Sequence, residues 1–208
     1  MRFYLPSVLL GLVASVSAQD TSQDGPFYLH ITGQSNSTID GYAASCHAGA
    51  AIEGLCYAEG PQPSGYSYEY YFNYTGSTQV GGSNVGVVSW HLPININDTQ
   101  SDLPQTINFQ YQQNSNIAAP MFGLGSVSGG TSLGFDADGK LFAYSYYDDS
   151  TFVPGQNPSP NGEGKAIYQW FVCWQYFTGY YYQSVGWAQT LPPHNPTCEA
   201  VDITQVFP

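Results

Sequence analysis

Turn-forming residues interrupt this chain every few positions, and this feature restricts the possible fold more than any other. The 208 residues include 23 glycines and 14 prolines, and Ser, Asn and Thr add further breaks. Between the breaks lie short runs rich in Tyr, Phe, Trp, Val and Ile, which are favoured in strands. Almost no segment has the pattern of a helix. We therefore predict an all-β, single-domain fold, either an antiparallel β-sandwich or a barrel-like fold with long loops.

The clearest strand pattern covers residues 66–74. Aromatic residues occupy every even position, and Ser67, Glu69 and Asn73 occupy odd positions. Side chains alternate between the two faces of a strand. The pattern therefore predicts one aromatic face and an opposite face on which Asn73 points to solvent.

Turn signals and apolar runs also predict two hairpins and several single strands. Asp138-Gly139 is a turn signal between apolar runs and predicts a hairpin over residues 135–142. A second hairpin is predicted from 167–177 and 180–187, turning at Thr178-Gly179. Its first arm is apolar on both faces, which is typical of a central, buried strand. Further strands are expected at 27–32, 85–92 and 106–112, a short helical turn within 48–55, and a long loop over 153–164.

The N-terminus has the layout of a secretory signal peptide. Arg2 precedes an apolar run, and Val16, Ser17 and Ala18 form a small-residue cleavage site. The run is shorter than the roughly 20 residues that span a membrane, and the alternative is a short N-terminal anchor helix. We predict a signal peptide at 1–18 and a single secreted β domain at 19–208.

The chain is strongly acidic, which limits its partners. Its net charge is −12, and Arg2, Lys140 and Lys165 are the only Lys or Arg residues. Binding to nucleic acid requires several basic side chains to displace counterions, so we expect no nucleic-acid partner. Anionic membranes would repel the chain, so we expect no membrane partner. Cleavage after Ala18 would also remove the only arginine, which argues against clamping of phosphate or carboxylate substrates.

Four cysteines in an exported chain predict two disulfides. Their order favours the local pairs Cys46–Cys56 and Cys173–Cys198, and long bridges between the two halves of the chain remain the alternative. No Cys-x-x-Cys pair is present, and histidines 30, 47, 91 and 194 show no metal-ligand spacing. We expect no metal site and no cofactor.

Three glycosylation sequons begin at Asn36, Asn73 and Asn97. Sequons behind a signal peptide indicate a eukaryotic secretory route. The alternative is that they occur by chance.

Acidic residues offer the nearest approach to a catalytic set. Asp136, Asp138, Asp148 and Asp149 cluster around the hairpin predicted at 135–142. Glycoside hydrolysis needs two carboxylates at a defined separation, which the sequence cannot supply, and a turn with acids at its ends is the favoured interpretation of the cluster. A calcium loop starting at Asp136 would need an acid at Ser145 and lacks it. No Gly-x-Ser-x-Gly motif is present either. We therefore assign no catalytic residue.

Aromatic residues give the remaining functional signal. Exposed rings on a rigid sheet can stack on the apolar faces of sugars, while nearby amides bond to sugar hydroxyls. The alternative is that the rings fill the core. The rings that crowd the second hairpin, and that form the predicted ligand platform, are Trp174, Tyr176, Tyr180, Tyr181, Tyr182 and Trp187.

Four segments together resemble a family of small secreted fungal proteins of unassigned function, some of which are labelled cell-wall or IgE-binding proteins. The segments are Phe27–His30, Cys46–Ile52, Phe135–Leu141 and Trp170–Trp174. The resemblance covers most of the chain after residue 18, but each motif is loose. It implies an all-β extracellular domain that associates with the fungal wall, and it carries over no catalytic residue.

Three functional hypotheses follow. The first is a secreted, non-enzymatic, extracellular or cell-wall-associated protein that binds polysaccharide through exposed aromatic rings. The second is a glycan-active hydrolase that draws its two carboxylates from Asp136, Asp138, Glu69 and Glu53. The third is an acidic secreted protein that interacts with a basic partner.

Overall fold

The computed structural model describes residues 21–36, 38–96, 99–123, 129–150, 152–157, 163–177 and 179–208. These residues form thirteen strands and one 3₁₀ turn, so the predicted all-β fold is confirmed. The elements are β1 (Ser22–Gly33), β2 (Asp40–Gly49), β3 (Ile52–Glu59), η1 (Tyr66–Tyr68), β4 (Tyr70–Val80), β5 (Ser83–Ile96), β6 (Thr99–Gln110), β7 (Ile117–Gly123), β8 (Leu133–Phe135), β9 (Leu141–Ser145), β10 (Lys165–Ile167), β11 (Trp170–Phe177), β12 (Tyr180–Ala188) and β13 (Glu199–Val206). The predicted signal peptide lies outside the described residues.

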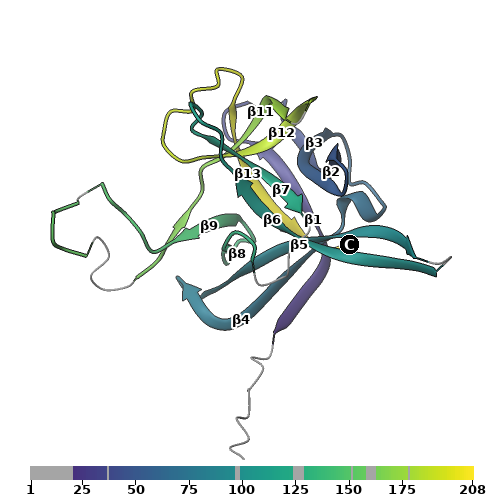
Figure 1. Ribbon diagram of the computed structural model, residues 1–208, viewed down its shortest axis with the longest axis horizontal. Coiled ribbons are helices and arrows are strands. Elements are labelled where there is room, and N and C mark those ends of the chain that lie inside the picture. Colours follow the sequence, from purple (N-terminus) through teal and green to yellow (C-terminus); the bar gives the residue numbers. More distant parts are fainter. Residues whose placement is uncertain are drawn as a thin grey trace, which may run out of the picture.

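Nine strands close into an antiparallel barrel. The order around it is β5-β4-β1-β13-β11-β12-β3-β7-β6, and β6 pairs back with β5 (Figure 1). Strand β2 pairs with β1 and β3, while β8, β9 and β10 extend the sheet outward from β5. Of the two predicted architectures, the sandwich and the barrel-like fold, the chain adopts the barrel.

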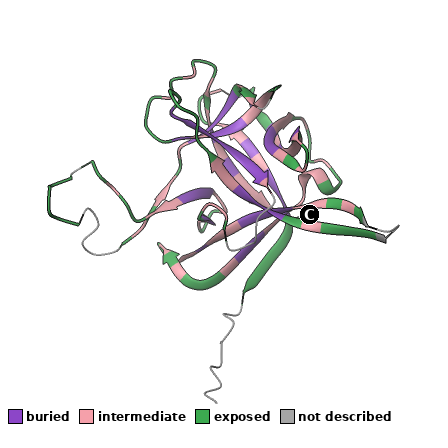
Figure 2. Cartoon of the chain, in the orientation of Figure 1, coloured by how far each residue is buried: buried purple, intermediate pink, exposed green. Residues whose placement is uncertain are grey.

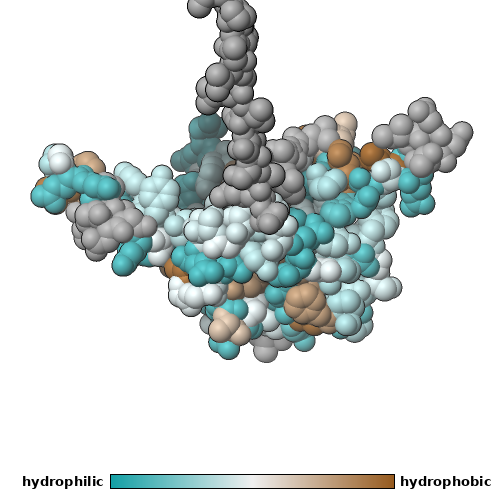
Figure 3. All heavy atoms as spheres, turned by 90° about the horizontal axis from the view of Figure 1, so that it is seen from below, coloured by the Kyte–Doolittle hydropathy of each residue, from teal (hydrophilic) through white to brown (hydrophobic). Residues whose placement is uncertain are grey.

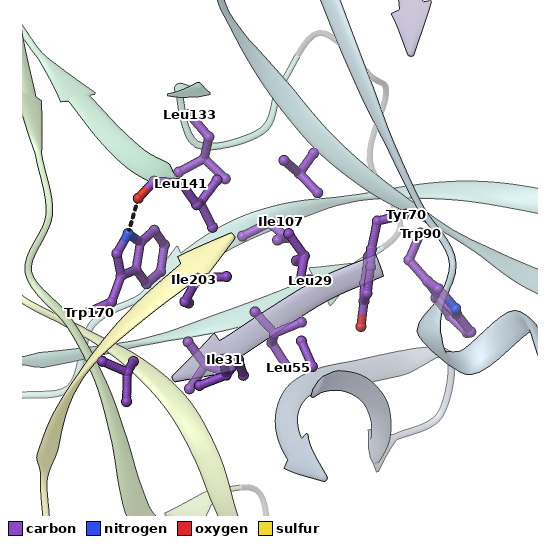
Figure 4. Packing of buried hydrophobic residues seen from close by; sticks show 14 of the residues in the cluster. Leu29, Ile31, Leu55, Tyr70, Trp90, Ile107, Leu133, Leu141, Trp170 and Ile203 are labelled. Atoms are coloured by element: carbon purple, nitrogen blue, oxygen red, sulfur yellow. Dashed lines mark hydrogen bonds between the residues drawn. The ribbon is translucent and has the colours of Figure 1, made fainter. Parts of the chain in front are cut away.

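The barrel interior is filled by aromatic and branched side chains from most of its strands. Figure 4 shows Leu29, Ile107 and Ile203 packed between the rings of Tyr70 and Trp170. The Trp170 indole Nε1 donates a hydrogen bond to the Leu141 carbonyl oxygen at 2.8 Å, so its one polar atom is satisfied. Each such side chain contributes about 1.5–3 kcal/mol on burial. This core therefore holds the barrel together.

Exposed residues lie mainly at the edges of the molecule. Buried positions concentrate where the strands cross, and the coloured parts of the outer β5–β6 hairpin and of the loop after β9 are largely exposed (Figure 2). The face drawn in Figure 3 is mostly hydrophilic to intermediate, with small, separate hydrophobic groups. On that face the apolar residues do not gather into a broad patch of the kind that marks large protein interfaces.

Both predicted hairpins are present. Strands β8 and β9 turn at Asp138-Gly139, where Gly139 adopts a φ of 76° that favours glycine. Strands β11 and β12 pair without a break from Trp170↔Trp187 to Phe177↔Tyr180. The long run predicted at 167–177 is interrupted, because β10 ends at Ile167 and β11 begins at Trp170. The described parts of 153–164 contain no strand, as expected of a loop.

The helical turn predicted within 48–55 is wrong. These residues end β2, turn at Ala50 and Ala51, and begin β3. The two strands pair from Gly41↔Glu59 to Gly49↔Ile52, with a register shift between His47 and Gly49. These strand pairings outweigh the weak helical preference of the segment.

The prediction for residues 66–74 holds only in part. Residues 66–68 form η1, and the strand starts at Tyr70. Tyr70 and Phe72 do face the core. Asn73 was expected to point to solvent, and this is wrong, because the residue is only 7% exposed. Neighbouring strands cover the outer face at this point, with Gln23 of β1 on one side and Ser89 of β5 on the other.

Both local disulfides are confirmed. Cys46 bridges to Cys56 across the β2–β3 hairpin, and Cys173 of β11 bridges to Cys198, just before β13. No cysteine is free. In the chain-entropy description, loops of this length contribute about 3 kcal/mol each.

Candidate functional site

The β11–β12 hairpin has one face that changes character along its length. Near the start of the hairpin, Trp170, Val172 and Val185 point from this face into the barrel core. Because side chains alternate along a strand, the same face continues toward the tip with other residues. These are Trp174, Tyr176, Tyr181 and Gln183, which we call the ring face.

The three aromatic side chains of the ring face are exposed. Tyr176 is 73%, Tyr181 62% and Trp174 43% exposed. The rings of Trp174 and Tyr181 stack with centroids 5.1 Å apart and an interplanar angle of 19°. Tyr176 pairs with Tyr181 in the strand ladder, so its side chain leaves the sheet on the same side as the stacked pair. This part of the predicted platform is assembled by the fold.

Two of the predicted rings lie on the opposite face of the hairpin. Tyr180 and Tyr182 stack with each other at 6.0 Å and face the β2–β3 hairpin. The Tyr182 hydroxyl donates to the His47 carbonyl oxygen at 3.0 Å, and the His47 ring contacts the Tyr180 ring edge-on. These tyrosines connect two hairpins and do not belong to the ring face.

Trp187 does not belong to the platform either. It packs against the barrel core, with its ring 5.3 Å from that of Phe109, and its indole nitrogen is buried. Trp187 points to the same side of the hairpin as Tyr181, but it lies six residue pairs farther along the ladder, next to the barrel core. Depth along the strand, which the sequence does not reveal, separates a core ring from an exposed one.

A polar pocket of about 240 Å³ adjoins the ring face. Its lining includes Trp174 and Tyr176 together with three residues that carry side-chain amides, Gln112, Gln113 and Asn195. None of the described residues that line the pocket is charged. These amides could not be predicted from the sequence, because they come from two distant segments, at 112–113 and 195, and no motif connects them.

The backbone beside the pocket is held in place by side chains. The Trp174 backbone N–H donates to Thr197 Oγ1 at 3.0 Å, and Asn195 Nδ2 donates to the Trp174 carbonyl oxygen at 2.9 Å. Asn195 Oδ1 accepts a hydrogen bond from Thr197 Oγ1 at 2.8 Å. Trp174 is therefore positioned before any ligand arrives, which lowers the entropic cost of binding.

The acids of the β8–β9 turn have structural partners. Asp136 Oδ1 accepts the backbone N–H groups of Asp138 and Lys140, and Asp136 Oδ2 accepts the hydroxyl of Tyr168. A hydrogen bond from Lys165 holds the pKa of Asp148 well below its usual value. These contacts support the reading of this cluster as a capped turn.

The other acids considered for hydrolysis lie elsewhere. Glu53 of β3 sits opposite His47, with 3.3 Å between Glu53 Oε1 and His47 Nδ1. Glu69 precedes β4 and lines a groove with Asp102. Among the described residues, no group of three or more His, Cys, Asp or Glu side chains could hold a metal ion. Over the same residues, no helix is long and apolar enough to cross a membrane.

The three sequon asparagines have different positions. Asn36 is half-buried, and its Oδ1 accepts hydrogen bonds from the backbone and hydroxyl of Thr38. Asn73 is buried, as described above. Asn97 lies outside the described residues.

A family model described as "Domain of unknown function (DUF7907)" matches residues 24–207. The chain belongs to this family. The match runs from β1 to β13, so the ring face and the neighbouring pocket lie inside the family's domain. No curated protein and no solved structure matches the chain.

Proposed function

We propose that this protein is exported, acts without catalysing a reaction, and associates with an extracellular matrix or cell wall by binding polysaccharide at the ring face. The observation that carries the proposal is the meeting of three exposed rings with an uncharged pocket lined by amides. Rings supply the apolar surface on which a sugar stacks, and amides supply donors and acceptors for its hydroxyl groups.

The chemistry of the pocket favours a neutral polysaccharide. The pocket has no basic residue that could pair with a uronic acid or a sulfate. Among its described lining residues there is also no carboxyl group, which would attract a charged amine when ionised or protonate a glycosidic oxygen when neutral. The resemblance to secreted fungal wall proteins agrees with such a ligand.

The test is a pull-down of the purified protein on insoluble β-glucan, chitin and mannan. We expect retention on at least one of them, and we expect Tyr176→Ala to weaken binding about fivefold, as the loss of about 1 kcal/mol from one ring would do. Tyr147→Ala is the matched control, because Tyr147 is also an exposed tyrosine but lies in the loop after β9. Its binding should equal that of the unchanged protein.

Other results would reject the proposal in separate ways. Failure to bind any of the three polymers would exclude polysaccharide binding and favour an acidic protein that interacts with a basic partner. Release of soluble oligosaccharides, abolished by a single Asp or Glu substitution, would show that the protein is a hydrolase. Binding that survives Tyr176→Ala and Tyr181→Ala together would move the site away from the ring face.

A further inference from the structure

A second groove lies away from the ring face, between the η1–β4 segment and the β5–β6 hairpin. Its volume is about 330 Å³, at the lower end of the range typical of small-molecule sites. Its functional lining residues are Tyr66, Glu69, Tyr71, His91 and Asp102, and we call it the acidic groove.

Hydrogen bonds and ring contacts fix the walls of the acidic groove. The Tyr71 ring lies flat on the His91 ring, with centroids 4.2 Å apart and an interplanar angle of 16°. His91 Nδ1 is 2.6 Å from Asp102 Oδ2 across the β5–β6 hairpin. The Trp90 indole donates to the Tyr66 carbonyl oxygen at 2.7 Å, which holds η1 against the barrel.

The groove carries negative charge, and the carboxylates of Glu69 and Asp102 both act on the Tyr71 hydroxyl. Burial raises the pKa of the Tyr71 hydroxyl, and the charges of Glu69 and Asp102 raise it further. Lys140 and Lys165, the two lysines of the chain, pair with Asp202 and Asp148 instead. Within the described residues, therefore, no lysine or arginine neutralises these carboxylates.

His91 carries an unmet hydrogen bond in this groove. Because a carboxylate accepts at Nδ1, that nitrogen is the donor and Nε2 is left as an acceptor. Nε2 is buried and has no partner among the described residues. A buried polar atom without a partner is unfavourable for folding and requires an explanation.

We propose that the acidic groove binds an amino sugar in its protonated form. The ammonium group would lie near the carboxylates of Glu69 and Asp102, and cation–π attraction to the tyrosine rings would add to this charge pairing. The sugar ring would stack on Tyr66, which is mostly exposed at the rim. An N-acetylated sugar has the same ring but no charge, so the groove distinguishes the two forms.

The test compares two probes at mildly acidic pH and low ionic strength, a glucosamine oligosaccharide and the matching N-acetylglucosamine oligosaccharide. Titration calorimetry should show binding of the charged probe only. Glu69→Gln, which keeps the shape of the side chain, should weaken that binding about tenfold, as the loss of a charged hydrogen bond predicts. Asp149→Asn removes an exposed carboxylate elsewhere on the surface and should leave binding unchanged.

Three outcomes would overturn the inference. Equal binding of the acetylated probe would show that charge is not recognised. A lysine tripeptide that binds as tightly as the charged oligosaccharide would assign the groove to basic peptides. An unchanged affinity in Glu69→Gln, with an unchanged unfolding midpoint, would place the amine elsewhere.

The acidic groove and the ring face can be tested independently. Tyr176→Ala should leave binding of the glucosamine oligosaccharide intact, and Glu69→Gln should leave retention on neutral polysaccharide intact. If neutral polysaccharide fails to bind while the charged probe binds, only the function proposed for the ring face is lost.

Discussion

At the scale of single residues, Asn73 acts as a bridge between three strands. Its Oδ1 accepts a hydrogen bond from Gln23 Nε2 of β1 at 2.7 Å, and its Nδ2 donates to Ser89 Oγ of β5 at 3.0 Å. Glycosylation would attach a sugar to the same Nδ2 atom. The side chain therefore has a structural use that competes with the use suggested by its sequon.

We predict that Asn73→Ala lowers the free energy of unfolding by about 1–3 kcal/mol, because fully buried Ser89 loses its partner. Urea unfolding measures this change. The double variant Asn73→Ala/Ser89→Ala should lose less stability than the two single changes added together, since both ends of the bond are then removed. Additive losses, or a stable protein with a glycan on Asn73, would contradict the role assigned to this bond.

At the scale of elements, the β8–β9 hairpin is fastened to β13 by its turn. The Gly139 carbonyl oxygen accepts the backbone N–H of Gln205 at 2.8 Å. Lys140 Nζ donates to Asp202 Oδ2 at 2.7 Å. Burial alone would raise the pKa of Asp202, but hydrogen bonds from Lys140 and Gln34 outweigh it and lower the pKa.

This lowered pKa predicts a pH dependence. A carboxyl group whose pKa is lower in the folded state stabilises the fold above its unfolded value of about 3.9, and the contribution is lost as pH falls through the folded pKa. The difference in unfolding free energy between the unchanged protein and Asp202→Asn should therefore be constant near neutral pH and shrink below about pH 4. Asp149→Asn, as an exposed control, should show no such convergence. A difference that grows on acidification would have the wrong sign.

Sequence patterns predicted the strands and turns themselves, but they did not predict how these elements pack against one another. The Asp138-Gly139 signal gave the turn because glycine suits its positive φ locally, but nothing local indicates that the turn docks on β13, more than sixty residues away. Likewise, alternation placed Tyr70 and Phe72 on one face, while the cover over Asn73 comes from a distant strand. The candidate sites depend still more on long-range pairing, since His91 meets Asp102 only through the register of β5 with β6.

At the scale of the whole molecule, charge is the most unusual property. The net charge is −12, and both lysines are engaged in ion pairs with single aspartates, so most carboxylates have no lysine to neutralise them. Like charges at this density repel one another and oppose the compact state.

We predict that added salt raises the melting temperature. The screening length falls from about 30 Å at 0.01 M to about 3 Å at 1 M, which weakens the repulsion. Thermal unfolding followed across this range tests the expectation, with sodium chloride as the salt. A variant that removes two exposed charges, Asp138→Asn/Asp149→Asn, should gain less from salt. A melting temperature that falls with salt would mean that the few ion pairs outweigh the repulsion.

The barrel closes with an odd number of strands, and this restricts how the strands can run. Antiparallel neighbours must alternate in direction, and nine is odd, so straight strands could not alternate all the way round such a ring. The conflict is resolved only if some strands bend and change partner along their length. Strand β5 does this, since it pairs with β4 as far as Trp90 and with β6 from Ser89 onward. One of these changes of partner thus falls next to His91, where the acidic groove opens.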